Sequence, residues 1–244
     1  ASRLIAGLSG SHRFIFEYLA EEIFQRQSPT RQTFLLYTSV LDQMDAASCE
    51  ALPQIANAQE MLEQLDHENL FVASLDARRR WYRYHFLFRE FLLAKLRREQ
   101  PEQLRALEIV AGKHYETHGE LETATVHYLE AEEFESAARV LDLLAPDYVE
   151  RGRVEALHRF LTMLPADVRH AHPDLLLQHG NVHRRLGEAG MAIIAYEDAR
   201  SAFSARGDMS GTSRALTRLA EINRAQGNYR QAEKLASQAL ESAP

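Results

Sequence analysis

Four glycines recur at similar spacings in the second half of the sequence, and this periodicity restricts the fold more than any other feature. Gly119, Gly152, Gly187 and Gly227 are 33, 35 and 40 residues apart. A small residue stands seven positions before each of them: Gly112, Ala145, Gly180 and Ala220. Small side chains at a fixed phase let two helices approach closely, and glycine closes the turn between them because it adopts a left-handed conformation at little cost. The pattern predicts paired helices that repeat along the chain.

The last repeat carries the pattern most completely. From Leu216 through Gly227 and Ala232 to Pro244 it resembles the tetratricopeptide repeat, a helix–turn–helix unit of about 34 residues. The residues around Gly207 to Gly211 are interpreted as a loop insertion that lengthens the last spacing. A closed antiparallel bundle with capping glycines is the alternative, but one phase kept over four units favours serial stacking.

Start signals for short helices fill much of the first hundred residues. Helices are expected from His12 to about Gln25, from Pro29, and over residues 46–52 and 58–67. Their predicted caps are Ser11, Ser28, Asp45 and Asn57. Residues 70–75 and 81–84 have the composition of two short strands, with a polar tip between them and a helix over 85–98 behind them. This order predicts a winged-helix-like domain with one short β-hairpin, followed by an α-solenoid of tetratricopeptide-like helix pairs, in a mainly α chain.

Several strings of residues resemble one family of regulators. They are L-D-A-R-R-R-W-Y-R-Y-H-F-L-F (75–88), G-S-H-R-F-I-F-E-Y-L-A-E-E-I (10–23), F-L-L-Y-T-S-V-L-D (34–42) and M-L-E-Q-L-D-H-E-N-L-F-V (61–72). In this order they resemble MalT-like, ATP-dependent LuxR-type transcriptional activators of the STAND class of signalling ATPases. The resemblance covers residues 7–145. It implies a winged-helix domain over 1–99, an arm and first repeat over 100–145, and sensor repeats over 146–244.

The same resemblance implies a function that this chain performs only as part of a longer protein. The chain would sense a small-molecule or protein effector and control nucleotide state and self-association. Its partners would be its own nucleotide-binding domain and, when activated, further copies of itself. DNA would be bound only through a C-terminal helix-turn-helix outside this chain. The P-loop motif is absent, and residues 7–11 do not replace it. ATP or ADP is therefore implied for the full-length protein, and no cofactor for this chain.

Composition fits a cytoplasmic protein without enzymatic activity of its own. Net charge is −7, which disfavours non-specific binding to nucleic acid. Cys49 is the single cysteine, as expected in a reducing compartment, and no apolar run is long enough to span a membrane. We find no nucleophile elbow and no paired-carboxylate arrangement in the sequence. The chain is therefore predicted not to be an enzyme.

His85 is the sharpest candidate for a functional residue. In the STAND class, a histidine at the start of the last winged-helix-domain helix touches the β-phosphate of ADP and holds the off state. A helix N-terminus attracts anions, and an imidazole there adds a hydrogen-bond donor. From the residues alone, a histidine packed between Tyr84 and Phe88 is the alternative. The resemblance favours phosphate sensing.

The repeats suggest a second candidate site. The first helices of stacked repeats line the concave surface of a solenoid. Alignment of the units places mixed polar residues on that side, which suits a small polar ligand or a peptide, although an ordinary solvated face has the same composition. These predicted groove residues are Lys113, Glu116, Asp142, Glu150, Asn181, Arg184, Glu221 and Arg224.

Three other functions are compatible with parts of the sequence. The chain could be a standalone tetratricopeptide scaffold that grips a partner's peptide. It could bind DNA through the basic hairpin at Arg78–Arg80 and Arg83, but Asp76 and Glu90 dilute that patch, which favours a solvated tip. The pairs His114/His118 and His179/His183 lie one helical turn apart, a spacing that suits a metal. Without an H-E-x-x-H motif or a nearby cysteine, ordinary packed histidines are favoured, and no metal site is predicted.

Overall fold

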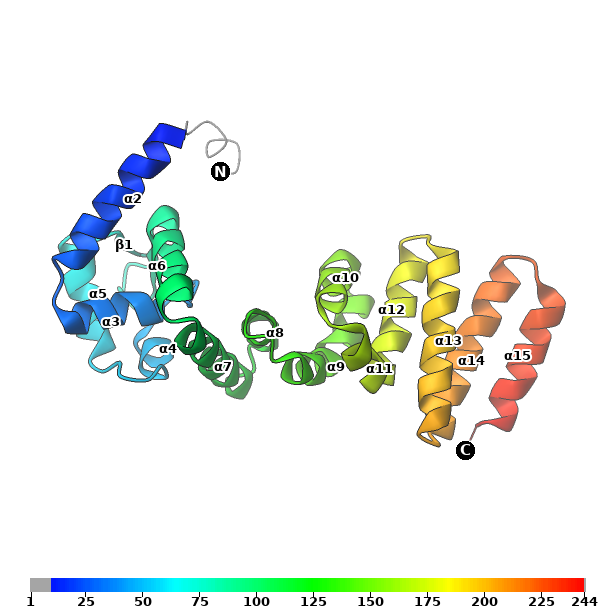
Figure 1. Cartoon of the computed structure of the whole chain (residues 1–244). Coiled ribbons are helices and arrows are strands. Elements are labelled where there is room, and N and C mark those ends of the chain that lie inside the picture. Colours follow the sequence, from blue (N-terminus) through cyan, green and yellow to red (C-terminus); the bar gives the residue numbers. More distant parts are fainter. Residues whose placement is uncertain (1–9, 244) are drawn as a thin grey trace. The chain divides into compact units, whose positions relative to one another are not determined.

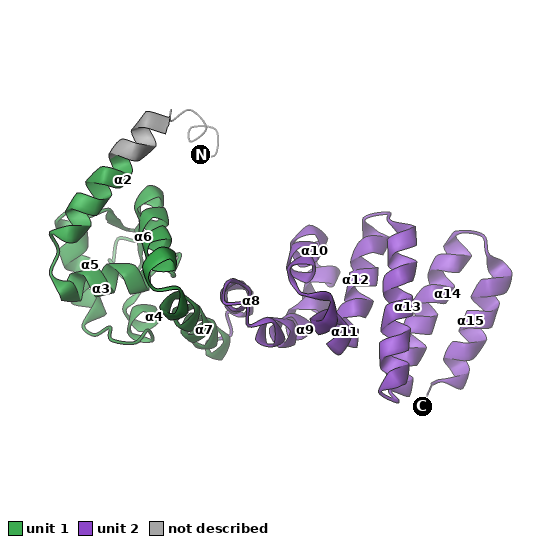
Figure 2. Ribbon diagram, in the orientation of Figure 1, with its two compact units in different colours: residues 1–118 green, residues 119–244 purple. Residues whose placement is uncertain are grey.

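Short helices and one β-hairpin make up the first part of the chain (Figure 1). The computed structural model describes residues 10–243, with side chains from residue 16 onward. Residues 1–118 and 119–244 form two compact units (Figure 2). Unit 1 contains α2 (Gly10–Gln25), α3 (Pro29–Thr38), α4 (Ala46–Glu50), α5 (Ala58–His67), β1 (Val72–Ser74), β2 (Tyr82–Tyr84), α6 (Phe86–Glu99) and α7 (Pro101–Thr117). The predicted order of helices, hairpin and further helix is confirmed.

The helix starts show which capping signals the chain uses. The Ser28 hydroxyl accepts from the Arg31 amide at the start of α3. Asp45 and Ser48 form a reciprocal capping box on α4. Asn57 differs from its prediction because its φ of +52° is left-handed and its side chain makes no cap bond. α2 begins at Gly10 rather than at His12, and the side chain of its predicted cap, Ser11, lies outside the described side chains.

The β-hairpin is fixed to the helices of unit 1 by buried polar and apolar contacts. β1 and β2 pair antiparallel, with Val72 opposite Tyr84. In β2 the side chains alternate, so that Tyr82 and Tyr84 are buried and Arg83 is exposed. The Tyr84 hydroxyl lies 2.7 Å from that of Thr38 in α3. The hairpin therefore presents its basic side chains outward from a fixed base.

Unit 2 is a series of helices that pack mainly on their sequence neighbours. It contains α8 (Leu121–Glu130), α9 (Phe134–Glu150), α10 (Val154–Met163), α11 (Ala166–Ala171), α12 (Pro173–Arg185), α13 (Ala189–Ala205), α14 (Met209–Ala225) and α15 (Tyr229–Glu241). α12 packs on α13, α13 on α14 and α14 on α15. This serial packing confirms the α-solenoid and argues against a closed bundle. All four periodic glycines have φ between +73° and +81°, as a left-handed turn requires.

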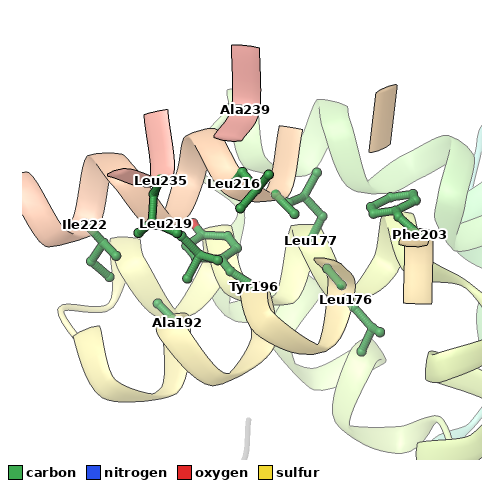
Figure 3. Close-up of a cluster of buried hydrophobic side chains, with 12 residues drawn as sticks. Leu176, Leu177, Ala192, Tyr196, Phe203, Leu216, Leu219, Ile222, Leu235 and Ala239 are labelled. Atoms are coloured by element: carbon green, nitrogen blue, oxygen red, sulfur yellow. The ribbon is translucent and has the colours of Figure 1, made fainter. Parts of the chain in front are cut away.

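Close helix packing in unit 2 depends on glycines that face aromatic rings. Tyr196 and Phe203 lie in a buried apolar cluster that α12, α13, α14 and α15 share (Figure 3). A Cβ on Gly180 would lie 2.3 Å from the Tyr196 ring, and one on Gly211 would lie 2.2 Å from the Phe203 ring. The predicted loop insertion at 207–211 is therefore wrong. Gly207 is the turn between α13 and α14, and Gly211 lies within α14.

Candidate functional site

His85 occupies the N-cap position of α6, where strand β2 passes into the helix. Its backbone N–H donates to the Phe71 carbonyl over 2.6 Å, which fixes the chain at this point. The side chain is exposed and makes no capping hydrogen bond. The ring centroids of Phe16 and Phe71 lie 6.3 and 6.4 Å from the imidazole. The imidazole thus stands beside the amide groups of a helix N-terminus, a place that favours an anion.

The basic tip of the hairpin is partly balanced by acidic groups. All of Arg78, Arg79 and Arg80 are exposed. The Arg79 guanidinium lies 3.7 Å from the carboxylate of Asp66, and that of Arg80 lies 3.9 Å from Asp76. Ion pairs of this kind lower the field that the tip presents to phosphates, as the interpretation of a solvated tip expects.

The predicted groove residues are divided between the two units. Lys113 and Glu116 lie on α7 in unit 1, and the other six lie in unit 2. Lys113, Glu150, Arg184 and Arg224 are exposed. Asp142 is bonded to the His172 ring over 2.7 Å, and Glu221 to Arg218 over 2.9 Å.

Asn181 differs from the expectation of a groove surface. It is buried, and its side-chain oxygen accepts from the Tyr196 hydroxyl over 2.9 Å. Its amide nitrogen donates to Gln178. Asn181 lies on the side of α12 that faces Tyr196 of α13. Its polar atoms therefore serve packing between these two helices.

A groove does lie along α14 and α15, where two of the predicted residues meet. Glu221 and Arg224 line it together with small apolar side chains, Ala220, Ala236 and Ala239 among them. Two large side chains at this groove stay open to solvent: Tyr229 is 70% exposed and Leu240 79%. The combination of small apolar side chains with charged residues suits a peptide or a further helix.

Histidines converge in unit 2 more closely than the sequence indicates. His179 and His183 on α12 have ring centroids 4.3 Å apart. His158, on α10, lies with its ring 5.7 Å from that of His179 and 5.4 Å from that of His183. Sequence reasoning missed His158, because it precedes His179 by 21 positions and belongs to another helix. No local spacing marks such a residue, and only the packing of α10 on α12 brings it in.

The order of the elements and the packing of neighbouring helices are those of a winged-helix domain followed in sequence by tetratricopeptide-type helix pairs. Comparison with known families agrees with both parts. Residues 20–104 match the MalT winged helix domain, and residues 173–244 match a tetratricopeptide repeat family. The chain is thus MalT-like, with a MalT-type winged helix and tetratricopeptide repeats behind it. No helix in the described part of the chain combines the length and the hydrophobicity of a membrane span.

Curated relatives share this combined region. The serine/threonine-protein kinase PknK of Mycobacterium tuberculosis is 30% identical over 171 residues, which cover 69% of this chain and 15% of the kinase. The HTH-type transcriptional regulator MalT of Vibrio cholerae is 29% identical over 167 residues, which cover 68% of this chain and 18% of the regulator. The chain therefore spans less than a fifth of the length of either relative.

Solved structures of repeat proteins give distant matches. A STAND protein with a tetratricopeptide repeat sensor from Pyrococcus horikoshii has a TM-score of 0.41 and 16% identity, over 93% of this chain and 46% of that one. MamA has a TM-score of 0.41 and 21% identity, over 65% of this chain and 88% of that one.

Proposed function

We propose that this chain is the regulatory and effector-sensing region of a cytoplasmic, ATP-dependent LuxR-type transcriptional regulator of the STAND class. In this role it catalyses nothing itself. Its winged helix holds ADP in a neighbouring P-loop domain and keeps the parent protein off. Its repeats bind an effector and favour the state in which the parent exchanges ADP for ATP and self-associates.

The difference between the two relatives supports a regulatory role. One is named as a serine/threonine-protein kinase and the other as an HTH-type transcriptional regulator. Both match this chain over about two thirds of its length. A region common to proteins with different outputs is best explained as the part that controls the output. The transcriptional parent is our choice because the winged helix matches the MalT domain.

The position of His85 is the observation that carries the proposal. Its exposed imidazole stands at the N-terminus of α6, where backbone amides and the helix dipole attract phosphate. Because the side chain makes no capping bond, a ring nitrogen can donate to a phosphate oxygen without first breaking an intramolecular bond. The rings of Phe16 and Phe71 are its aromatic neighbours.

Effector control requires that the effector binds the on and off states with different affinities. The repeats supply the surface, since tetratricopeptide helix pairs present extended faces to partners. Two of the predicted groove residues, Glu221 and Arg224, line the groove on α14 and α15. An amphipathic helix or a peptide with apolar anchors fits this groove.

The test is a His85→Ala substitution in the full-length protein that contains this chain. Because alanine cannot donate a hydrogen bond to the phosphate, the off state is weakened. Basal transcription without effector should therefore rise, and self-association should no longer require the effector. His67→Ala is the matched control, because His67 is also exposed and also lies in unit 1, at the end of α5. Reporter transcription and light scattering measure the two outputs. If both variants behave like the wild type, His85 does not hold the off state.

A further inference from the structure

We propose that His158, His179 and His183 form a binding site for a divalent transition-metal ion of the zinc class. The site is independent of the nucleotide-linked role proposed above. It lies wholly within unit 2, between α10 and α12. One ring nitrogen from each histidine lies within 4.8 Å of the other two.

The distances are close to those of a bound site. Zinc–imidazole bonds of about 2.05 Å in a tetrahedral site place nitrogen atoms about 3.3 Å apart. The three rings therefore need to draw together by at most about 1.5 Å. Side-chain torsions supply that movement, since His179 and His183 already lie on one face of α12 at the i, i+4 spacing of known two-histidine sites.

Two ring nitrogens of the cluster lack hydrogen-bond partners. His158 Nδ1 and His179 Nε2 are both buried and unbonded. Buried polar atoms in proteins nearly always have partners, and each one without a partner destabilises the folded state. Coordination of one cation by these nitrogens satisfies them together. Packing of structural histidines alone leaves these two nitrogens without a partner.

Glu188 orients the third ligand. Its carboxylate lies 2.6 Å from His183 Nδ1. An ionised carboxylate only accepts hydrogen bonds, so the proton of His183 stands on Nδ1 and the lone pair is on Nε2. This carboxylate–histidine arrangement is the usual support of metal-bound histidines, because it fixes the tautomer and makes the ring a stronger ligand.

The surroundings of His179 disfavour a positive charge on its ring. Burial, together with the nearby His183, Arg169 and His158, lowers the pKa of His179 to about 4. Arg169 on α11 places a positive charge nearby, but its guanidinium is held by the carbonyl oxygens of Leu161 and Leu164. The carboxylate of Glu188 offsets that charge.

The ligand set selects the class of ion. Imidazole nitrogens suit zinc, copper, nickel and cobalt, whereas magnesium and calcium prefer oxygen ligands. Three histidines leave the fourth position of a tetrahedral site for water or another ligand. An ion held here would join α10 to α12, which belong to successive helix pairs, so metal binding would stiffen the stack.

Calorimetric titration of the chelator-treated chain with zinc tests the site. We expect one ion per chain, no binding of magnesium, and a rise in Tm on zinc addition because the ion binds only the folded state. His158→Ala and His179→Ala should each weaken zinc binding by more than about 100-fold, and Glu188→Gln by about 10- to 100-fold, as loss of a supporting carboxylate does elsewhere. Circular dichroism establishes that each variant is folded, and His158→Gln replaces His158→Ala if the alanine variant is not.

His114→Ala is the matched control. His114 and His118 share the i, i+4 spacing and a ring separation of 4.3 Å with His179 and His183, but they lie in unit 1, where His114 is on α7 and His118 is its C-cap. Zinc binding should be unchanged in this variant. The proposal is overturned if the wild type binds no zinc, if His158→Ala and His179→Ala keep full affinity, or if His114→Ala removes the binding.

Discussion

Replacement of Gly180 by alanine tests the close helix approach on which the repeat stack depends. The added Cβ would lie 2.3 Å from Tyr196 Cε1 and 2.4 Å from Cδ1. Carbon atoms in contact sit about 3.5–4.0 Å apart, so the ring or the helix must move by more than about 1 Å. Tyr196 is fully buried and its hydroxyl is bonded to Asn181, so the ring has little freedom to move aside.

The expected magnitude follows from two opposing effects. Overpacking of a buried site costs about 1–3 kcal/mol, and a rigid aromatic ring at this distance belongs near the upper end. Alanine in place of glycine inside a helix raises the free energy of unfolding by about 1 kcal/mol. The net loss in the free energy of unfolding should therefore be about 2 kcal/mol. For a unit of this size that lowers Tm by roughly 6–10 °C.

Thermal and urea unfolding followed by circular dichroism measure this loss, with Gly190→Ala as the matched control. Gly190 lies within α13, and a Cβ there meets nothing within 4 Å. That substitution should leave stability unchanged or raise it by less than about 1 kcal/mol. In a Tyr196→Leu background the cost of Gly180→Ala should largely disappear, because the clashing ring is gone. Equal stability of the Gly180→Ala and Gly190→Ala variants would refute the packing argument.

Two further predictions concern unit 1. Asp45→Ala removes the side chain that accepts from the Ser48 amide over 2.8 Å. Urea denaturation should show a loss of about 1 kcal/mol in the free energy of unfolding. No change would mean that the cap on α4 is dispensable. The Asp76 carboxylate accepts from the backbone amides of Trp81 and Arg80. These bonds, that to Trp81 above all, lower the pKa of the Asp76 carboxyl. Its stabilisation of the hairpin is present above the ordinary carboxyl pKa and is lost as pH falls through the lowered native value. The urea midpoint of Trp81 fluorescence should therefore be higher for the wild type than for Asp76→Asn near neutral pH, and this difference should begin to shrink only below about pH 4. A difference that does not depend on pH would contradict this.

Much of the fold was predictable because it depends on local signals. Gly119, Gly152, Gly187 and Gly227 mark turns that need a positive φ, and little except glycine adopts one cheaply. The signal at Ser28 followed by Pro29 fixes the start of α3 in the same local way. Alternation in β2 similarly settles which of its side chains are buried.

The errors arose where helix length or contacts between helices decide the outcome. Gly207–Gly211 resembled a loop by composition, but α13 and α14 are longer than α12 and account for the longer spacing. Asn57 had a typical capping residue type, but its backbone is left-handed and its side chain makes no cap bond. The Glu50 carboxylate accepts from the first amide of α5 instead.

The candidate sites were predictable to different degrees for the same reason. His85 was found because its helix-start position and its neighbours in sequence form one continuous string. Asn181 was expected in a groove, although its helix phase directs it to Tyr196. His158 joins His179 and His183 only through packing of α10 on α12, which a single sequence does not encode as a spacing.

The rate of ADP release from the full-length protein that contains this chain tests the central proposal most directly. A hydrogen bond to a charged group contributes about 1.5–3 kcal/mol, so loss of the imidazole should speed ADP release by about 10- to 100-fold. Stopped-flow measurement with a fluorescent ADP analogue compares His85→Ala with the wild type and with His67→Ala. Faster release in His85→Ala alone is the predicted result. Equal rates in all three proteins would contradict a nucleotide-sensing winged helix.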